Sequence, residues 1–219
     1  MSSTLKTIFR FLLLLLGIQA VRALLIFGMW TLWHPAGESI TWIYMDMVSF
    51  LLVGTGLLLI FRPQPQQLGL SWKDAPKLER WAYILGGGII VLMVGGSYFF
   101  SPEVLITNIQ TVIILPVFEE LLFRGWGWKQ VERVGASKHT GLICWLLISF
   151  FFGIWHFGYM DIYILKVAPL WPEMQWGSFL LMKFLTTFVI GLVVGLPRWK
   201  TGRVYGSYLF HAMINLIGR

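Results

Sequence analysis

The chain has 219 residues, of which 57% are hydrophobic and 12% are charged, and its net charge is +7. A soluble domain of this length could not cover so much apolar surface, so water-soluble classes of protein are excluded. No basic cluster is dense enough for a nucleic-acid surface, and the charge is therefore interpreted as a signal of membrane topology. The composition predicts a polytopic membrane protein whose surroundings are the lipid bilayer and which has no nucleic-acid partner.

Several apolar runs approach the roughly 20 residues that a helix needs to cross the hydrocarbon core of a bilayer. Glycine- and proline-containing turns separate these runs. Seven membrane-spanning helices are expected at residues 8–33, 41–61, 81–100, 104–128, 140–158, 177–196 and 204–217. The predicted fold is an all-α, multi-pass transmembrane helical bundle of about seven to eight spans, forming a single integral-membrane domain over residues 1–219.

The first apolar run follows Lys6 and Arg10, as it would in a cleavable signal peptide, but it continues past Arg22 to Trp33. An uncleaved first span is therefore expected. Lys and Arg gather on one side of the alternating turns, which places the N-terminus in the cytoplasm and indicates a cytoplasmic (inner) membrane. This side holds twelve of the 17 basic residues: Lys6, Arg10, Arg62, Lys73, Lys77, Arg80, Lys129, Arg133, Lys138, Arg198, Lys200 and Arg203.

Three ionisable residues lie close together in the fourth expected span: Glu119, Glu120 and Arg124. Each such group near a bilayer centre costs roughly 2.5–3.5 kcal/mol on insertion scales, so a compensating role is expected. Residues four apart share a helix face, and Glu120 can therefore pair with Arg124. Glu119 is rotated by about 100° and needs a partner from elsewhere, or a proton. Glu119 is thus the candidate reactive carboxylate, supported by the Glu120–Arg124 pair.

Two further spans carry polar groups at the same spacing, Phe152 with His156 and His211 with Asn215. An imidazole and a carboxylate together can hold and deprotonate a water molecule. A histidine and an asparagine can donate hydrogen bonds to an oxyanion. Because no Ser or Cys occupies a comparable setting, a water nucleophile is more plausible than a covalent one.

Each motif also has a structural interpretation. Glu120 and Arg124 alone would be explained as an interhelical ion pair, and His211 with Asn215 as hydrogen bonds that hold membrane helices together. Asp46 is expected at the membrane interface. Taken jointly, the motifs favour a site, because Glu119 stays unexplained unless the other polar groups converge on it.

A metal site is a second interpretation of the same residues. Glu119, His156 and His211 could provide three zinc ligands. The sequence has no His-Glu-x-x-His spacing, however, and no cofactor is expected.

The three motifs, in this order on separate spans, resemble the CPBP family of intramembrane proteases, also called the Abi or CAAX-protease family. The family pattern is Glu-Glu-x-x-x-Arg, then Phe-x-x-x-His, then His-x-x-x-Asn or a close variant, and this sequence matches each part. The resemblance covers a core of about residues 68–215.

The resemblance implies a glutamate-dependent endopeptidase. Glu119 would activate water with help from His156, His211 and Asn215 would form the oxyanion site, and Glu120, Arg124 and Phe152 would support the arrangement. The implied substrate is a peptide or protein segment held at the membrane, with lipidation left open.

Two rivals stay open: a catalytically silent membrane protein that acts in binding, immunity or scaffolding, and a transporter that uses Glu119 as a proton carrier. The depth of His156 is a further question. At 1.5 Å per residue it would lie about 27 Å from Lys138, deeper than Glu119 from Lys129 at about 15 Å. This requires either a tilted fifth span or a fourth span that continues as a helix after Arg124.

Overall fold

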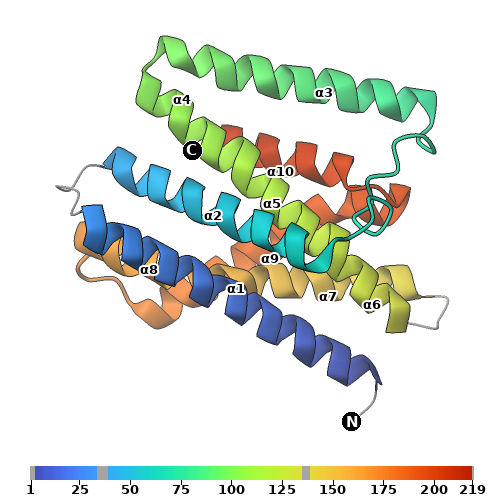
Figure 1. Cartoon of the computed structure of the whole chain (residues 1–219), viewed down its shortest axis with the longest axis horizontal. Coiled ribbons are helices and arrows are strands. Elements are labelled where there is room, and N and C mark those ends of the chain that lie inside the picture. Colours follow the sequence, from blue (N-terminus) through green and yellow to red (C-terminus); the bar gives the residue numbers. More distant parts are fainter. Residues whose placement is uncertain (1–2, 34–38, 135–138, 219) are drawn as a thin grey trace.

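The computed structural model describes residues 3–33, 39–134 and 139–218, and every regular element in these ranges is helical (Figure 1). Within these described ranges, six helices are long and apolar enough to cross a membrane. The expected class, an all-α transmembrane bundle, is therefore confirmed. The helix expected at 204–217 is present as α10 (Tyr205–Ile217), but its 13 residues rise only about 20 Å, less than the hydrocarbon thickness.

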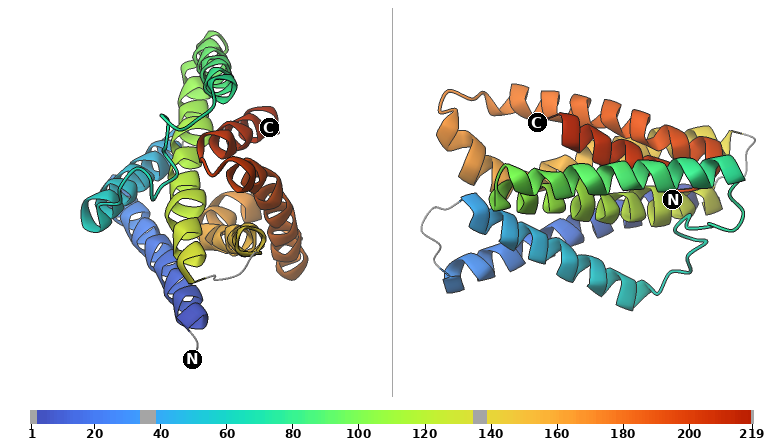
Figure 2. Two further views of the ribbon diagram at one scale, coloured as in Figure 1. Left: turned by 90° about the vertical axis from the view of Figure 1, so that its right-hand side faces the viewer. Right: turned by 90° about the horizontal axis from the view of Figure 1, so that it is seen from above.

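A long, nearly continuous helix occupies the centre of the bundle (Figure 2). On one side it meets α1 (Ser3–Trp33) and α2 (Ser39–Phe61), which pack against each other. On the other side lie α7 (Thr140–Trp155), α9 (Trp176–Thr201) and α10. The helix α3 (Lys77–Gly96), extended by the turn η1 (Ser97–Phe99), packs against α10 at the edge of the molecule.

The central helix changes its winding on both sides of the paired glutamates. It consists of α4 (Pro102–Asn108), the π-helical η2 (Ile109–Ile114), α5 (Leu115–Glu120), the π-helical η3 (Leu121–Gly127) and α6 (Trp128–Val134). Pro116 has no N–H to donate to the preceding turn, which accounts for the wider winding before α5. The helix continues beyond Arg124 to Val134, as one of the two explanations for the depth of His156 requires; Lys138 lies outside the described residues.

Two further residues predicted to belong to the site, Phe152 and His156, lie on α7 and in the turn that follows it. After α7 the chain forms the 3-10 turn η4 (His156–Tyr159), α8 (Met160–Ile162), the π-helical η5 (Tyr163–Val167) and the 3-10 turn η6 (Ala168–Leu170). Then α9 returns across the bundle and ends at Thr201. The next residue, Gly202, has a φ of +70°, in the left-handed region that favours glycine.

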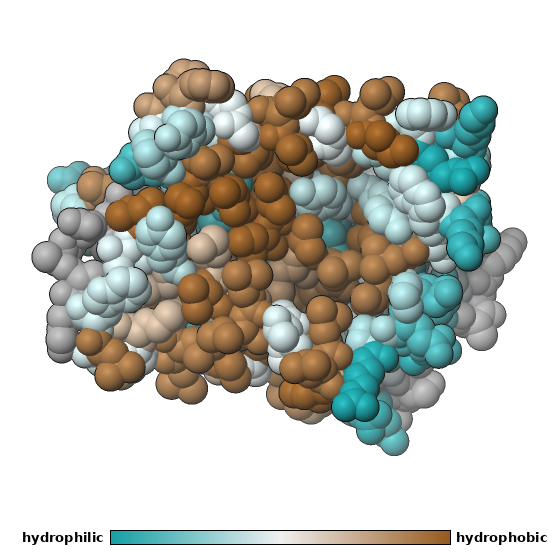
Figure 3. Space-filling model, turned by 45° about the horizontal axis from the view of Figure 1, so that its top comes forward, coloured by the Kyte–Doolittle hydropathy of each residue, from teal (hydrophilic) through white to brown (hydrophobic). Residues whose placement is uncertain are grey.

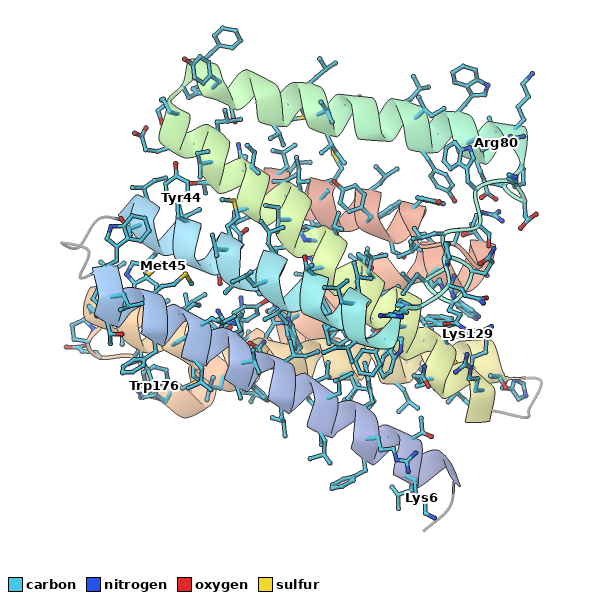
Figure 4. The ribbon with its side chains drawn as sticks, viewed as in Figure 1. Lys6, Tyr44, Met45, Arg80, Lys129 and Trp176 are labelled. Atoms are coloured by element: carbon cyan, nitrogen blue, oxygen red, sulfur yellow. The ribbon has the colours of Figure 1, made fainter. Side chains whose placement is uncertain are left out.

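Apolar side chains cover the outside of the bundle as well as its core. Large residues such as Leu32, Leu92 and Phe99 are 88%, 75% and 90% exposed, and Figure 3 shows brown apolar residues over the middle of the visible face, with teal polar residues at its right-hand end. Such a surface suits a lipid environment. Lys6, Arg80 and Lys129 lie at one end of the bundle, and Tyr44, Met45 and Trp176 lie towards the other (Figure 4).

Candidate active site

The predicted pair of Glu120 and Arg124 is present on the central helix, with 3.0 Å between Glu120 Oε1 and Arg124 Nη1. Both side chains are buried. Arg124 Nη2 also donates to the carbonyl of Gly191 on α9 at 2.9 Å, and the guanidinium carbon lies 4.4 Å from the centre of the Phe152 ring. The pair therefore anchors the central helix to both α7 and α9.

Glu119 finds its partners on α7 and η4, where two neutral donors meet the same carboxylate oxygen. The indole Nε1 of Trp155 and the hydroxyl of Tyr159 each donate to Glu119 Oε1 at 2.7 Å. The carboxylate is only 1% exposed. Both donors use Oε1, and Oε2 receives neither of them.

His211 of α10 lies between the two glutamates. Its Nδ1 donates to Glu120 Oε1 at 2.9 Å, and its Nε2 lies 3.6 Å from Glu119 Oε2. A carboxylate oxygen only accepts, so Nδ1 carries a proton. The structure thus brings Glu119, Glu120, Arg124 and His211 into one buried cluster.

His156 lies beside this cluster, across the ring of Phe152. Its Nδ1 donates to the Phe152 carbonyl at 2.7 Å, and this bond leaves Nε2 as the nitrogen with a free lone pair. The Phe152 ring centre is 4.8 Å from that of His156 and 5.6 Å from that of His211. The Phe152 ring is therefore close to both imidazoles, and the centre of the Tyr159 ring lies 5.6 Å from that of His156.

Asn215 has a different immediate partner from the other predicted residues. It lies one turn after His211 on α10, and its amide Nδ2 donates to the carbonyl of Thr111 in the π-helical η2 at 2.7 Å. This bond joins α10 to the central helix. It fixes the rotation of α10 and hence the approach of His211 to the glutamates.

Sequence reasoning missed Trp155 and Tyr159, the two hydrogen-bond donors to Glu119. A signal was available, since both are aromatic residues with a polar tip, four apart, next to the predicted His156. It was obscured because aromatic residues are common near the ends of membrane spans.

A second buried polar cluster surrounds Arg22 of α1, whose side chain is 0% exposed. It pairs with Asp46 Oδ1 on α2 at 3.0 Å and with Asp161 Oδ1 on α8 at 2.6 Å. Gln110 Nε2 of η2 donates to the other oxygen of Asp46 at 2.7 Å. Asp46, expected at the interface, is thus part of a cluster that links α1, α2, α8 and the central helix.

An apolar cavity of about 290 Å³ lies between α1, α2 and the central helix. Its wall includes Val117 and Phe118, directly before the paired glutamates, and also Phe50 and Trp126. Phe118 stacks on Trp155, with 6.1 Å between ring centres, so one ring separates the cavity from a donor to Glu119.

Among the described residues, no group of three or more His, Cys, Asp or Glu side chains is arranged to hold a metal ion. Glu119 and His211 are neighbours, while the ring of His156 interacts with Phe152 and Tyr159. Independence of metal stays a prediction.

Comparison with protein families gives one match. The model of the family described as type II CAAX prenyl endopeptidase Rce1-like matches residues 101–217, just over half of the chain. No curated protein and no solved structure matches it. The matched segment contains all seven predicted site residues. It begins at residue 101, later than the expected start of the core at about residue 68. The organisation as a single domain stays a prediction.

Proposed function

The chain belongs to the Rce1-like family of type II CAAX prenyl endopeptidases, and from this premise we propose that it hydrolyses peptide bonds within or at the membrane by means of a water molecule activated by Glu119 and His156. The observation that carries the proposal is the pair of donors on Glu119 Oε1, which leaves Oε2 directed towards His211. A buried carboxylate without an arginine partner is suited to taking a proton.

In the proposed reaction, Glu119 Oε2 takes one proton of the attacking water, and His156 Nε2 helps by accepting a hydrogen bond from the other O–H of that water. The oxygen of that water bonds to the scissile carbonyl carbon, whose oxygen becomes an oxyanion. Asn215 and His211 donate hydrogen bonds to this oxyanion, and for this His211 carries a proton on Nε2 as well as on Nδ1. Such a contribution is worth about 3–4 kcal/mol per donor in other enzymes. The C–N bond then breaks, and the proton held by the glutamate passes to the leaving amine.

The supporting residues hold these groups in place. Glu120 accepts from both Arg124 and His211, so it fixes the ring whose other nitrogen faces Glu119. The bond from Arg124 to Gly191 ties the same unit to α9. For Asn215 to reach an oxyanion, its amide must give up or share its bond to Thr111 when substrate binds.

The proposed substrate is a peptide segment of a membrane-associated protein, and the apolar cavity beside Phe118 supports a substrate that carries a lipid group. We also propose that the N-terminus lies in the cytoplasm of a cell whose inner membrane holds the protein. The gathering of Lys6, Arg80 and Lys129 at one end of the bundle supports this orientation (Figure 4).

The test is peptide cleavage by the purified protein in nanodiscs, with a mixed library of quenched and lipidated peptides. Wild type, wild type with a chelator, and Glu119→Ala are compared. Cleavage that resists the chelator and is lost in Glu119→Ala is expected. Loss with the chelator would identify a metalloprotease. A well-folded wild type that cleaves nothing across the library would favour the catalytically silent binding protein.

A further inference from the structure

The C-terminal end of α7 is capped by side chains of α1, a helix far away in sequence. Where α7 gives way to the turn η4, main-chain carbonyls lose their helical partners. Gln19 Nε2 donates to the carbonyl of Trp155 at 3.2 Å, and Arg22 Nη2 donates to that of Gly158 at 3.2 Å. These bonds fix the main chain on either side of His156.

The guanidinium of Arg22 is itself fixed from three directions. Nε donates to Gln19 Oε1 at 2.9 Å, while Nη1 and Nη2 donate to Asp46 and Asp161. A cation at a helix C-terminus is favourable, since the free carbonyls there carry partial negative charge. Arg22 is therefore held rigidly against the Gly158 carbonyl of η4, next to the α7 carbonyl that Gln19 binds, and together they form the cap.

The capped turn carries the groups that surround the reactive carboxylate. Trp155, the last residue of α7, and Tyr159, the last residue of η4, both donate to Glu119 Oε1. His156 lies between them in the chain. Arg22 also contacts the turn directly, with its guanidinium carbon 4.9 Å from the centre of the Tyr159 ring. A shift of this turn would move both donors and the imidazole together.

We propose that Arg22, with Gln19, is a positioning residue of the active site: by capping α7 from α1, it holds Trp155, His156 and Tyr159 in register with Glu119. This inference rests on the proposed function and extends the site beyond residues 101–217, the segment that the family model matches. The first span would then position active-site residues in addition to crossing the membrane.

A purely structural role makes a different prediction. Polar side chains between membrane helices often serve only to hold the bundle together. Their loss lowers stability but leaves kcat unchanged in the fraction that is folded. A positioning role lowers kcat in the folded protein while substrate binding, measured by KM, changes little.

The experiment compares three variants with wild type. Arg22→Met combined with Asp46→Asn and Asp161→Asn removes the cap and leaves no unpaired charge in the bilayer. Gln19→Leu removes the bond to the Trp155 carbonyl and the acceptor of Arg22 Nε without any change in charge. It provides a second test if the triple variant does not fold. Arg10→Met makes the same arginine substitution at an exposed position of α1 and serves as the matched control.

Three quantities are measured: thermal stability, kcat and KM on a peptide that wild type cleaves, and the rate at which a hydrophobic carbodiimide modifies Glu119, followed by mass spectrometry. Because misplacement by about 1 Å can cost 10²-fold in rate, kcat is expected to fall about 10- to 100-fold in the folded triple variant, with KM within about twofold. Gln19→Leu is expected to show a smaller loss of kcat, and Arg10→Met none. Modification of Glu119 is expected to accelerate several-fold in the triple variant.

The proposal would be overturned if the triple variant and Gln19→Leu both fold, both show the kcat of wild type, and both have Glu119 modified at the wild-type rate. If wild type cleaves no peptide, the proposed function fails, and the carbodiimide rates still decide the positioning claim. Unchanged rates would then reject it, and accelerated rates would support it.

Discussion

The two buried clusters, around Arg22 and around Arg124, contain similar groups that are paired differently. Each contains one arginine and two carboxylates. Arg22 pairs with both of its carboxylates, Asp46 and Asp161, whereas Arg124 pairs with Glu120 alone. Glu119 is the one carboxylate of the four that receives neutral donors instead of an arginine.

The remaining members of the clusters differ in the same sense. Around Arg22 the additional partners are the amides of Gln19 and Gln110, which do not titrate. Beside Glu119 the additional partner is His211, whose imidazole nitrogens can donate or accept a hydrogen bond. The proposed roles follow this difference: we assign the fully paired cluster to the cap and the incompletely paired Glu119 to proton transfer.

The largest expected effect on activity, after the loss of Glu119 itself, comes from His156. In His156→Gln the side chain can no longer offer a basic Nε2, and general acid–base catalysis typically contributes 10²- to 10⁴-fold, so kcat is expected to fall by roughly that factor. The matched control is His139→Gln, at the residue directly before α7, which should retain wild-type kcat. Equal loss in both variants would show that the effect is not specific to the site.

Removal of Arg124 is expected to have the largest effect on stability. Arg124→Met leaves Glu120 buried without its ion-pair partner, and breaking a buried pair in this way costs about 3–5 kcal/mol. Unfolding of the variant in mixed micelles measures the cost. The double variant Arg124→Met with Glu120→Gln should recover part of it, and no recovery would mean that packing on Phe152 dominates.

A smaller effect is expected from Tyr159→Phe, which removes one of the two donors to Glu119 Oε1. One lost hydrogen bond to a charged group is worth about 1.5–3 kcal/mol, so kcat should fall roughly 10- to 100-fold with little change in KM. Tyr44→Phe, on α2 and partly exposed, is the control. An unchanged kcat in Tyr159→Phe would indicate that Trp155 alone is sufficient.

The smallest effect is expected from Gly158→Ala, which acts through the cap. A Cβ at this position would clash with Cγ and Cδ of Gln19, and it would displace that side chain from the Trp155 carbonyl. Overpacking of this kind costs about 1–3 kcal/mol of stability, and a loss of kcat of a few-fold should accompany it. Gly87→Ala, where a Cβ would meet no atom within 4 Å, is the control.

The sequence predicted what local spacing determines. The pairing of Glu120 with Arg124 follows from four-residue spacing on one helix, and the bundle class follows from the apolar runs. The donors to Glu119 lie 36 and 40 residues away, and only the packing of α7 on the central helix brings them there. The cap by Arg22 spans 136 residues between α1 and Gly158, so no local pattern could reveal it.

The most direct test of the central claim is to neutralise each of the four carboxylates in turn and to measure cleavage of one quenched peptide. Glu119→Gln keeps an oxygen that can accept from Trp155 and Tyr159, so the fold should be retained while kcat falls by at least about 10³-fold. Glu120→Gln, Asp46→Asn and Asp161→Asn should each retain measurable cleavage when folded. A folded Glu119→Gln that cleaves at the wild-type rate would contradict the assignment of Glu119 as the reactive carboxylate.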